Sequence, residues 1–434
     1  MTKYAYKKLK NCEDDDVRKK IGKFICQVGS IRNNSFRKSL LDDILYKLTN
    51  NDVVFDDNNY LFLFDNAVFD LNEGKIIKSN PLDYMSISCG YDYVEVNEDL
   101  INELHGLLNT IFPDVNVKNH YLEILATGLC GLQIEKNFIA TGKGGNGKSL
   151  INSLMLKTTG NYGYKLPSAV LLKEIKQGAN PEVANLDGKR FTLIQEPDPN
   201  KKICASTLKE LTGDKTLNVR ALYSNKCVIQ LKLTIVMEAN DLPKLDEVND
   251  ALSRRTDITP FISKAVSKEI YDAAEDKTGL LVANPEYKTD EFQNKLKSVL
   301  FFLLLPYFKD FKNNKYVLSS PPEIIKQQNN KYLANSDTLY EWFISKYQQC
   351  DGEVISIGDI WKVWEQDILG IATLSRRMKG KYTSKAKLLE AIEMNIFLSK
   401  SLKGRNKLYG KKQLSTPSMC GWKRKDDEEN ENDE

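Results

Sequence analysis

The segment TGKGGNGKSL, residues 141–150, contains residues whose types and spacing could bind a triphosphate. Gly142, Gly147, Lys148 and Ser149 have the G-x-x-x-x-G-K-[ST] spacing of a phosphate-binding loop. The glycines let the backbone curl so that successive N–H groups point at the phosphates, while the lysine reaches the β- and γ-phosphates and the serine hydroxyl holds Mg²⁺. We therefore predict an ATP site formed by Gly142, Lys143, Gly144, Gly145, Asn146, Gly147, Lys148, Ser149 and Leu150.

Two more segments could supply the groups that hydrolysis needs, which are an acid at a strand end and a group near the γ-phosphate. The segment 188–200 predicts an apolar strand followed by Glu196 and Asp198, which could order Mg²⁺ and water. Residues 231–237 predict another strand, and Asn240 follows at its end, where an amide could bond the attacking water or the γ-phosphate. In isolation, Asn240 could equally belong to a simple strand-end turn.

An arginine pair, Arg254 and Arg255, precedes a further extended run. An arginine there could reach the active site of a neighbouring subunit and stabilise the transition state, although a solvated basic pair is the ordinary alternative.

The elements that must position these residues lie in a predicted ATPase domain, residues 133–318. Strands alternate with helices to about residue 261, which predicts a parallel sheet flanked by helices, and residues 262–318 are predicted to be mainly helical. The strand 136–141 leads into the loop, and the helix that follows directs its positive N-terminal end at the anion. Residues 1–132 predict helices and a hairpin over 60–80, with its turn at 72–74. Residues 319–414 predict a winged-helix-like domain, and residues 415–434 predict a disordered acidic tail.

The amino-acid composition indicates which classes of partner, metal site and compartment this chain fits. The 434 residues carry a net charge of +3, and setting aside the seven acids of residues 426–434 leaves +10 on the remainder, which is compatible with nucleic acid. Eight scattered cysteines and two histidines make structural zinc very improbable, and together with a polar N-terminus they predict a reducing intracellular compartment. The longest apolar run, residues 299–305, is too short to span a bilayer, so we expect no membrane association.

The loop, the two strand-end segments and the arginine pair follow one another in a fixed order, and this order resembles the superfamily 3 helicases. The nearest group looks like the poxvirus-type primase–helicases of nucleocytoplasmic large DNA viruses and related phage proteins. The resemblance covers roughly residues 40–345 and implies an AAA+-like core, a helical collar before it and a winged helix after it. It also implies ATP-driven movement along single-stranded DNA as a hexameric ring.

Carried over by position, the resemblance implies that Lys148 and Ser149 bind phosphate and Mg²⁺ and that Glu196 polarises water. Asn240 would sense the γ-phosphate, and Arg255 is the expected trans-acting finger. Many members have two adjacent acids at the first strand end, whereas Gln195 precedes Glu196 here. The choice between Glu196 and Asp198 as the metal ligand therefore stays open.

DNA contacts are expected in two places. The segment 208–232 resembles the hairpin that projects into the ring channel of this family, with Lys226 near its tip and Lys209 and Arg220 in support. In the C-terminal domain, residues 376–412 carry twelve basic and two acidic residues, with Lys403 and Arg405 on the predicted wing.

The leading hypothesis is a replicative DNA helicase that acts on single-stranded or forked DNA. The alternatives are a motor that packages or remodels nucleic acid and an origin-binding factor gated by ATP. The family often carries a primase domain upstream, and we expect priming to come from a separate primase or polymerase chain.

Overall fold

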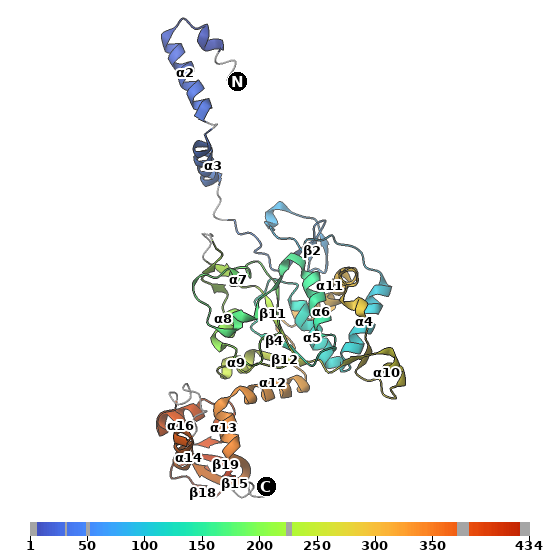
Figure 1. Ribbon diagram of the computed structural model, residues 1–434, viewed down its shortest axis with the longest axis vertical. Helices are drawn as coiled ribbons and strands as arrows, with labels where there is room; N and C mark the ends of the chain where they lie inside the picture. The colour runs from blue at the N-terminus through green and yellow to red at the C-terminus, as the bar shows by residue number, and fades with distance from the viewer. Residues whose placement is uncertain (1–6, 31–32, 49–52, 223–227, 371–381, 426–434) are drawn as a thin grey trace. The chain divides into compact units, whose positions relative to one another are not determined.

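A computed structural model describes residues 7–30, 33–48, 53–222, 228–370 and 382–425 of the 434-residue chain (Figure 1). The chain divides into two compact units, Met1–Asp57 and Asn58–Glu434. Within the described ranges, every helix is too short or too polar to cross a bilayer.

The first unit contains the helices predicted for this region, α2 (Asp15–Ser30) and α3 (Asn34–Leu48). No residue of α3 is buried, and its Leu41 and Leu45 are each 54% exposed. Its apolar positions therefore contribute little to a core within this unit.

The second unit begins with an antiparallel three-stranded sheet, made of β1 (Leu61–Leu63), β2 (Val68–Asp70) and β3 (Lys75–Ile77). The predicted hairpin is β2–β3, and its turn includes Gly74 at a φ of 66°. The part of the predicted hairpin that precedes its turn forms two strands, β1 and β2, instead of one. The chain reverses between them, where the N–H of Phe64 donates to the carbonyl of Ala67 at 2.8 Å.

A five-stranded parallel sheet, in the order β12-β4-β11-β7-β5, forms the centre of this unit and confirms the predicted α/β core. Its strands are β4 (Asn137–Thr141), β5 (Gly163–Lys165), β7 (Phe191–Gln195), β11 (Thr234–Ala239) and β12 (Thr256–Pro260). Successive side chains of a strand point to opposite faces, so Phe191 and Leu193 join one hydrophobic cluster and Ile194 joins another. The sheet is therefore covered by apolar side chains on both faces.

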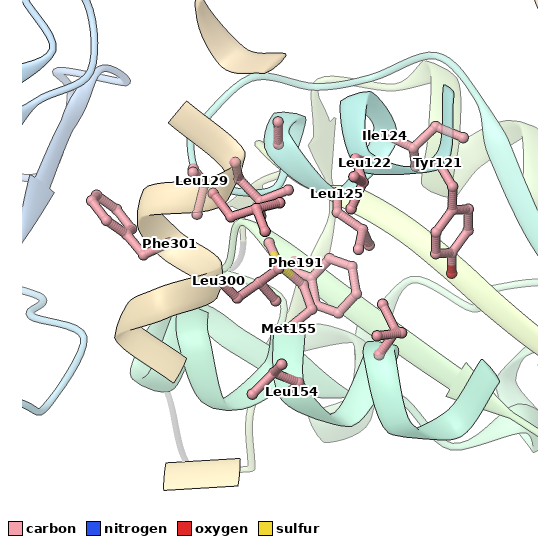
Figure 2. Packing of buried hydrophobic residues seen from close by; sticks show 14 of the residues in the cluster. Tyr121, Leu122, Ile124, Leu125, Leu129, Leu154, Met155, Phe191, Leu300 and Phe301 are labelled. Carbon is pink, nitrogen blue, oxygen red and sulfur yellow. The ribbon is translucent and has the colours of Figure 1, made fainter. Parts of the chain in front are cut away.

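Helices α5 (Val115–Thr127), α6 (Lys148–Thr159) and α11 (Asp290–Asn313) supply the first cluster, where their side chains surround Phe191 (Figure 2). Asp114 begins α5, because its carboxylate accepts the N–H groups of Asn116 and Val117. On the other face, α8 (Ala205–Gly213), α9 (Asp250–Arg255) and α12 (Glu323–Ser336) contribute Leu208, Leu252 and Leu333 to the second cluster.

The remaining elements of this region are α4 (Glu98–Ile111), which adds buried residues to the first cluster, and several short helices and strands. The short elements are β6 (Gly178–Ala179), α7 (Pro181–Ala184), β8 (Thr216–Leu217), β9 (Val219–Arg220), β10 (Ile229–Gln230), β13 (Lys264–Val266), α10 (Lys268–Ala273) and β14 (Leu280–Val282).

The C-terminal part has its own aromatic core around Trp342, Phe343, Trp364 and Trp422. Its elements are α13 (Thr338–Lys346), β15 (Tyr347–Ser356), α14 (Ile357–Gly370), α16 (Lys385–Glu393), β16 (Leu402–Lys403), β17 (Leu408–Tyr409), β18 (Lys412–Gln413) and β19 (Ser418–Arg424). The assignment of this part as a winged-helix-like domain stays a prediction.

The predicted end of this domain at residue 414 is wrong. Strand β19 pairs with both β15 and β16 in a three-stranded antiparallel sheet, and the ring of Trp422 packs edge-on against Phe343. Residues 418–424 therefore belong to the domain core, and of the predicted acidic tail only residues 426–434 lie outside the described part of the chain.

Candidate nucleotide site

The loop between β4 and α6 has a backbone that glycine alone adopts readily. Gly142, Gly145 and Gly147 have φ angles of 148°, 78° and 83°. A Cβ atom on Gly142 would lie 2.3 Å from the carbonyl oxygen of Phe261, so a larger residue would displace the backbone. The tip of the loop, residues 143–145, is exposed, and its N–H groups precede the N-terminus of α6. This is the arrangement in which a helix start binds an anion.

Two residues of the predicted ligand set have structural partners of their own. The Nδ2 atom of Asn146 donates to the carbonyl of Phe261 at 3.0 Å, and its Oδ1 accepts the N–H of Lys148 at 3.3 Å. Leu150 packs partly buried against the first hydrophobic cluster. Both side chains therefore hold the loop and the helix in place.

The side chain of Lys148 lies across the carboxyl end of the sheet. Its Nζ atom donates to Oδ1 of Asn240 at 2.8 Å and to the carbonyl of Gly142 at 3.0 Å. Burial lowers the pKa of Lys148, while the negative charges of Glu238 and Glu196 oppose that shift. The structure thus brings Lys148, Asn240 and Glu196 to one edge, as parallel strands require.

Glu238 is a site residue that the sequence patterns missed. It is 2% exposed on β11, and its Oε2 atom accepts hydrogen bonds from Oγ of Ser149 and from Nε2 of Gln195, each at 3.0 Å. Its Oε1 atom accepts from Nδ2 of Asn152 at 2.8 Å. An acid inside an otherwise apolar strand is the signal that could have identified it.

The two acids after β7 lie in different surroundings. Glu196 is exposed with a φ of 46°, an uncommon conformation for a residue with a side chain, and its N–H donates to the carbonyl of Glu238 at 2.9 Å. Asp198 accepts the N–H of Asn200 at 3.0 Å and pairs with Lys201 at 3.4 Å, so it stabilises a local turn. Over the described residues, no three His, Cys, Asp or Glu side chains are grouped as a metal site.

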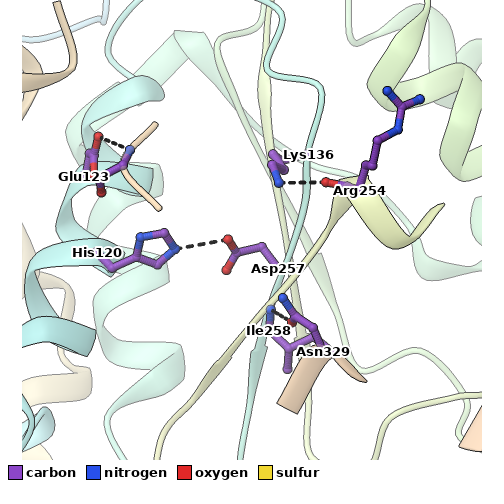
Figure 3. Close-up of polar contacts among 8 residues, drawn as sticks. His120, Glu123, Lys136, Arg254, Asp257, Ile258 and Asn329 are labelled. Atoms are coloured by element: carbon purple, nitrogen blue, oxygen red, sulfur yellow. Dashed lines mark hydrogen bonds and ion pairs between the residues drawn. The ribbon is translucent and has the colours of Figure 1, made fainter. Parts of the chain in front are cut away.

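The side chains of the two arginines differ in exposure and in their contacts. The side chain of Arg255 is 18% exposed; its guanidinium lies 3.7 Å from a carboxylate oxygen of Glu135 and packs beside Gly213. Arg254 is exposed, its carbonyl accepts a hydrogen bond from Lys136 at 2.7 Å, and its side chain extends away from that lysine (Figure 3). Of the pair, Arg254 is the one whose charged group is free to reach another molecule.

A buried polar pair joins α5 to the strand that follows these arginines. Nε2 of His120 lies 3.1 Å from Oδ2 of Asp257, with both side chains at most 2% exposed (Figure 3). On the same strand, the N–H of Ile258 donates to Oδ1 of Asn329 at 2.8 Å. These contacts fix β12, and with it the end of α9, against the helices.

The residues predicted to contact DNA lie on separate elements. Strands β8 and β10 pair antiparallel with Leu217 opposite Ile229, so the expected hairpin is present at its base. Lys226, near its expected tip, lies outside the described residues, and Lys209 and Arg220 are partly exposed on α8 and β9.

On the predicted wing, Arg405 is exposed, whereas Lys403 is engaged locally. Nζ of Lys403 donates to the carbonyl of Leu408 at 3.3 Å and lies 5.1 Å from the centroid of the Tyr409 ring. Part of the positive charge on the wing therefore holds the wing together.

Comparisons with known proteins match most of the chain. A family model described as D5 N terminal like matches residues 3–113, and a model for a family of unknown function matches residues 140–255. The chain is 30% identical over 335 residues to "Putative helicase L207/L206" of Acanthamoeba polyphaga mimivirus, covering 74% of this chain and 34% of that protein. It is 27% identical to "Primase D5" of Fowlpox virus, covering 60% of this chain and 35% of that protein.

The chain thus spans about a third of the length of these curated relatives. Among solved structures, the C-terminal region of NrS-1 aligns with a TM-score of 0.44 at 12% identity, covering 88% of this chain and 90% of that one.

Proposed function

The chain is a relative of the poxvirus-type D5 primase–helicases of large DNA viruses, and on that premise we propose that it is an ATP-dependent DNA helicase of viral DNA replication. In this proposal it moves along single-stranded DNA as a homo-hexameric ring at the replication site in the host cell. A primase or polymerase chain is the proposed partner. A nucleic-acid motor without unwinding activity is the second candidate, because its nucleotide site would be the same.

The observation that supports the proposal is the grouping of Lys148, Ser149 and Asn240 where a glycine loop meets the start of α6. The donors suit ATP with Mg²⁺: a buried ammonium, an exposed hydroxyl and the N–H groups of the loop tip and the helix start. Bound Mg²⁺–ATP would supply the phosphoryl group that is transferred to water.

Each residue then has a role in this chemistry. Lys148 binds the β- and γ-phosphates, Ser149 holds the cation, and Asn240 orients the attacking water or the γ-phosphate. Glu196 accepts a proton from that water, and an arginine of the pair at residues 254–255 offsets negative charge from a neighbouring protomer.

DNA would be held by its phosphates rather than by its sequence. Lys209, Arg220 and Lys226 are the proposed contacts around the β8–β10 hairpin, and Arg405, with Lys403, is the proposed contact on the wing.

A strand-displacement assay on a forked duplex tests the proposal. The full chain should displace the labelled strand with ATP and Mg²⁺, the Lys148→Ala variant should not, and Lys226→Ala should hydrolyse ATP without displacement. DNA-stimulated hydrolysis without displacement would favour the motor, and binding of ATP with negligible turnover would favour the origin-binding factor.

A further inference from the structure

Glu238 is a buried carboxylate that forms no ion pair within 4 Å among the described residues, although its negative charge acts on the Lys148 ammonium. Its three hydrogen bonds come from the neutral side chains of Ser149, Asn152 and Gln195. Buried charges in proteins are ordinarily paired or coordinate a metal. A divalent cation bound beside the hydroxyl of the phosphate loop would therefore balance this negative charge.

The hydrogen bond from Ser149 has a direct consequence for cation binding. Because the hydroxyl hydrogen of Ser149 is donated to Glu238, the lone pairs of its oxygen are left for another partner. A hard cation such as Mg²⁺ takes oxygen ligands of this kind.

The carboxylate and the amide of this site lie on neighbouring strands. Glu238 on β11 and Gln195 on β7 are register partners in the parallel sheet, and the amide of Gln195 donates to the carboxylate. The last residue of β7 thus carries an amide, and the buried acid lies one strand over.

A second layer holds the carboxylate in its orientation. The hydroxyl of Tyr121 donates to Oδ1 of Asn152 at 2.6 Å, which leaves the Asn152 amide to donate to Glu238. Burial raises the pKa of Tyr121 well above its ordinary value, so this hydroxyl stays a donor. The network is neutral apart from Glu238.

We propose that Glu238 is the positioning carboxylate on the Mg²⁺ side of this site: it orients the Ser149 hydroxyl and accepts hydrogen bonds from the water bound to the cation. This inference rests on the proposed nucleotide site. It gives an acid on β11 a role beside the cation that the sequence analysis gave only to Glu196 or Asp198 after β7, and it leaves Glu196 to polarise the attacking water.

The test is the Mg²⁺ dependence of binding of a fluorescent, non-hydrolysable ATP analogue to the full chain. Glu238→Gln should raise the Mg²⁺ concentration at half-saturation at least about tenfold, which corresponds to the loss of one charge-assisted contact. Binding in excess EDTA should not weaken. Glu73→Gln, the same change at an exposed carboxylate in the β2–β3 turn, should match the wild type.

A double variant that exchanges the two residues, called the exchanged variant, distinguishes a role of Glu238 in cation binding from a structural role. Glu238→Gln combined with Gln195→Glu restores one carboxylate and one amide across the same strand pair, and it should recover most of the wild-type Mg²⁺ response. A wild-type Mg²⁺ response in Glu238→Gln, or an exchanged variant no better than Glu238→Gln, would overturn the inference alone. A wild-type chain that binds no nucleotide would overturn the proposed function as well.

Discussion

The Nζ atom of Lys148 donates a hydrogen bond to Oδ1 of Asn240 at 2.8 Å, and this bond joins the phosphate loop to the end of β11. The two side chains come from segments far apart in the sequence, and the parallel pairing of β4 with β11 brings them together. A ligand that draws the lysine toward its phosphates would therefore also change the surroundings of the amide.

Asn240→Ala should lower ATP turnover on the order of a hundredfold, because the attacking water or the γ-phosphate loses its orienting amide. Binding of the nucleotide should persist, since Lys148 and the loop remain. Steady-state phosphate release and nucleotide titration measure the two effects. Asp241→Ala, at the exposed neighbour, is the control and should behave as the wild type; equal losses in both variants would point to a disturbed strand end instead.

The arginine pair should separate into a functional and a structural member. Arg254→Ala should lower turnover on the order of a thousandfold without lowering the melting temperature, because its exposed charge is the one free to act in trans. Arg255→Ala should cost about 1 kcal/mol of unfolding free energy, since its side chain packs beside Gly213 and near Glu135.

Mixing Arg254→Ala with Lys148→Ala protomers should restore part of the turnover if the arginine acts across a subunit boundary. A variant of Arg255 that melts normally but loses turnover would instead support the sequence-based prediction of Arg255 as the finger.

On the wing, Arg405→Ala should weaken binding of single-stranded DNA and reduce the slope of log affinity against log salt by about 0.7, as expected for one lost phosphate contact. Lys403→Ala should change that slope less, because its ammonium is engaged with the Leu408 carbonyl and the Tyr409 ring. Fluorescence anisotropy over a salt series measures both slopes. An unchanged slope for Arg405→Ala would exclude that residue as a DNA contact.

Buried thiols should resist alkylation at pH 8. Burial raises the pKa of Cys130 to about 12 and that of Cys89 to about 11, so each holds very little thiolate at this pH. Cys26 is exposed and should react first among the cysteines of the described ranges. Timed labelling with iodoacetamide and peptide mass analysis gives the order; labelling of Cys130 as fast as Cys26 would mean that this core opens readily.

Much of the fold could be predicted because its signals are local. The strand 137–141 is continuously buried, the loop glycines have the spacing of a phosphate site, and the helix begins at Lys148. Asn240 could be placed because an amide directly after an apolar strand lies at the carboxyl edge of a parallel sheet.

What could not be predicted depends on neighbours in space. Glu238 lies one residue beyond the run 231–237, and nothing local shows that its carboxylate faces Ser149. The side chain of Arg255 is more restrained than that of Arg254, because it lies near Glu135, which is distant in sequence. Strand β19 was missed because its pairing with β15 is long-range and an acidic run follows it.

The most direct test of the central claim is ATP hydrolysis by the full chain with Mg²⁺, in the presence and absence of single-stranded DNA, compared with Lys148→Ala. We expect Mg²⁺-dependent turnover that DNA stimulates and that falls to background in the variant, because the buried ammonium that bonds to Gly142 and Asn240 is lost. Equal hydrolysis by both proteins, or none by the wild type under any of these conditions, would contradict the account.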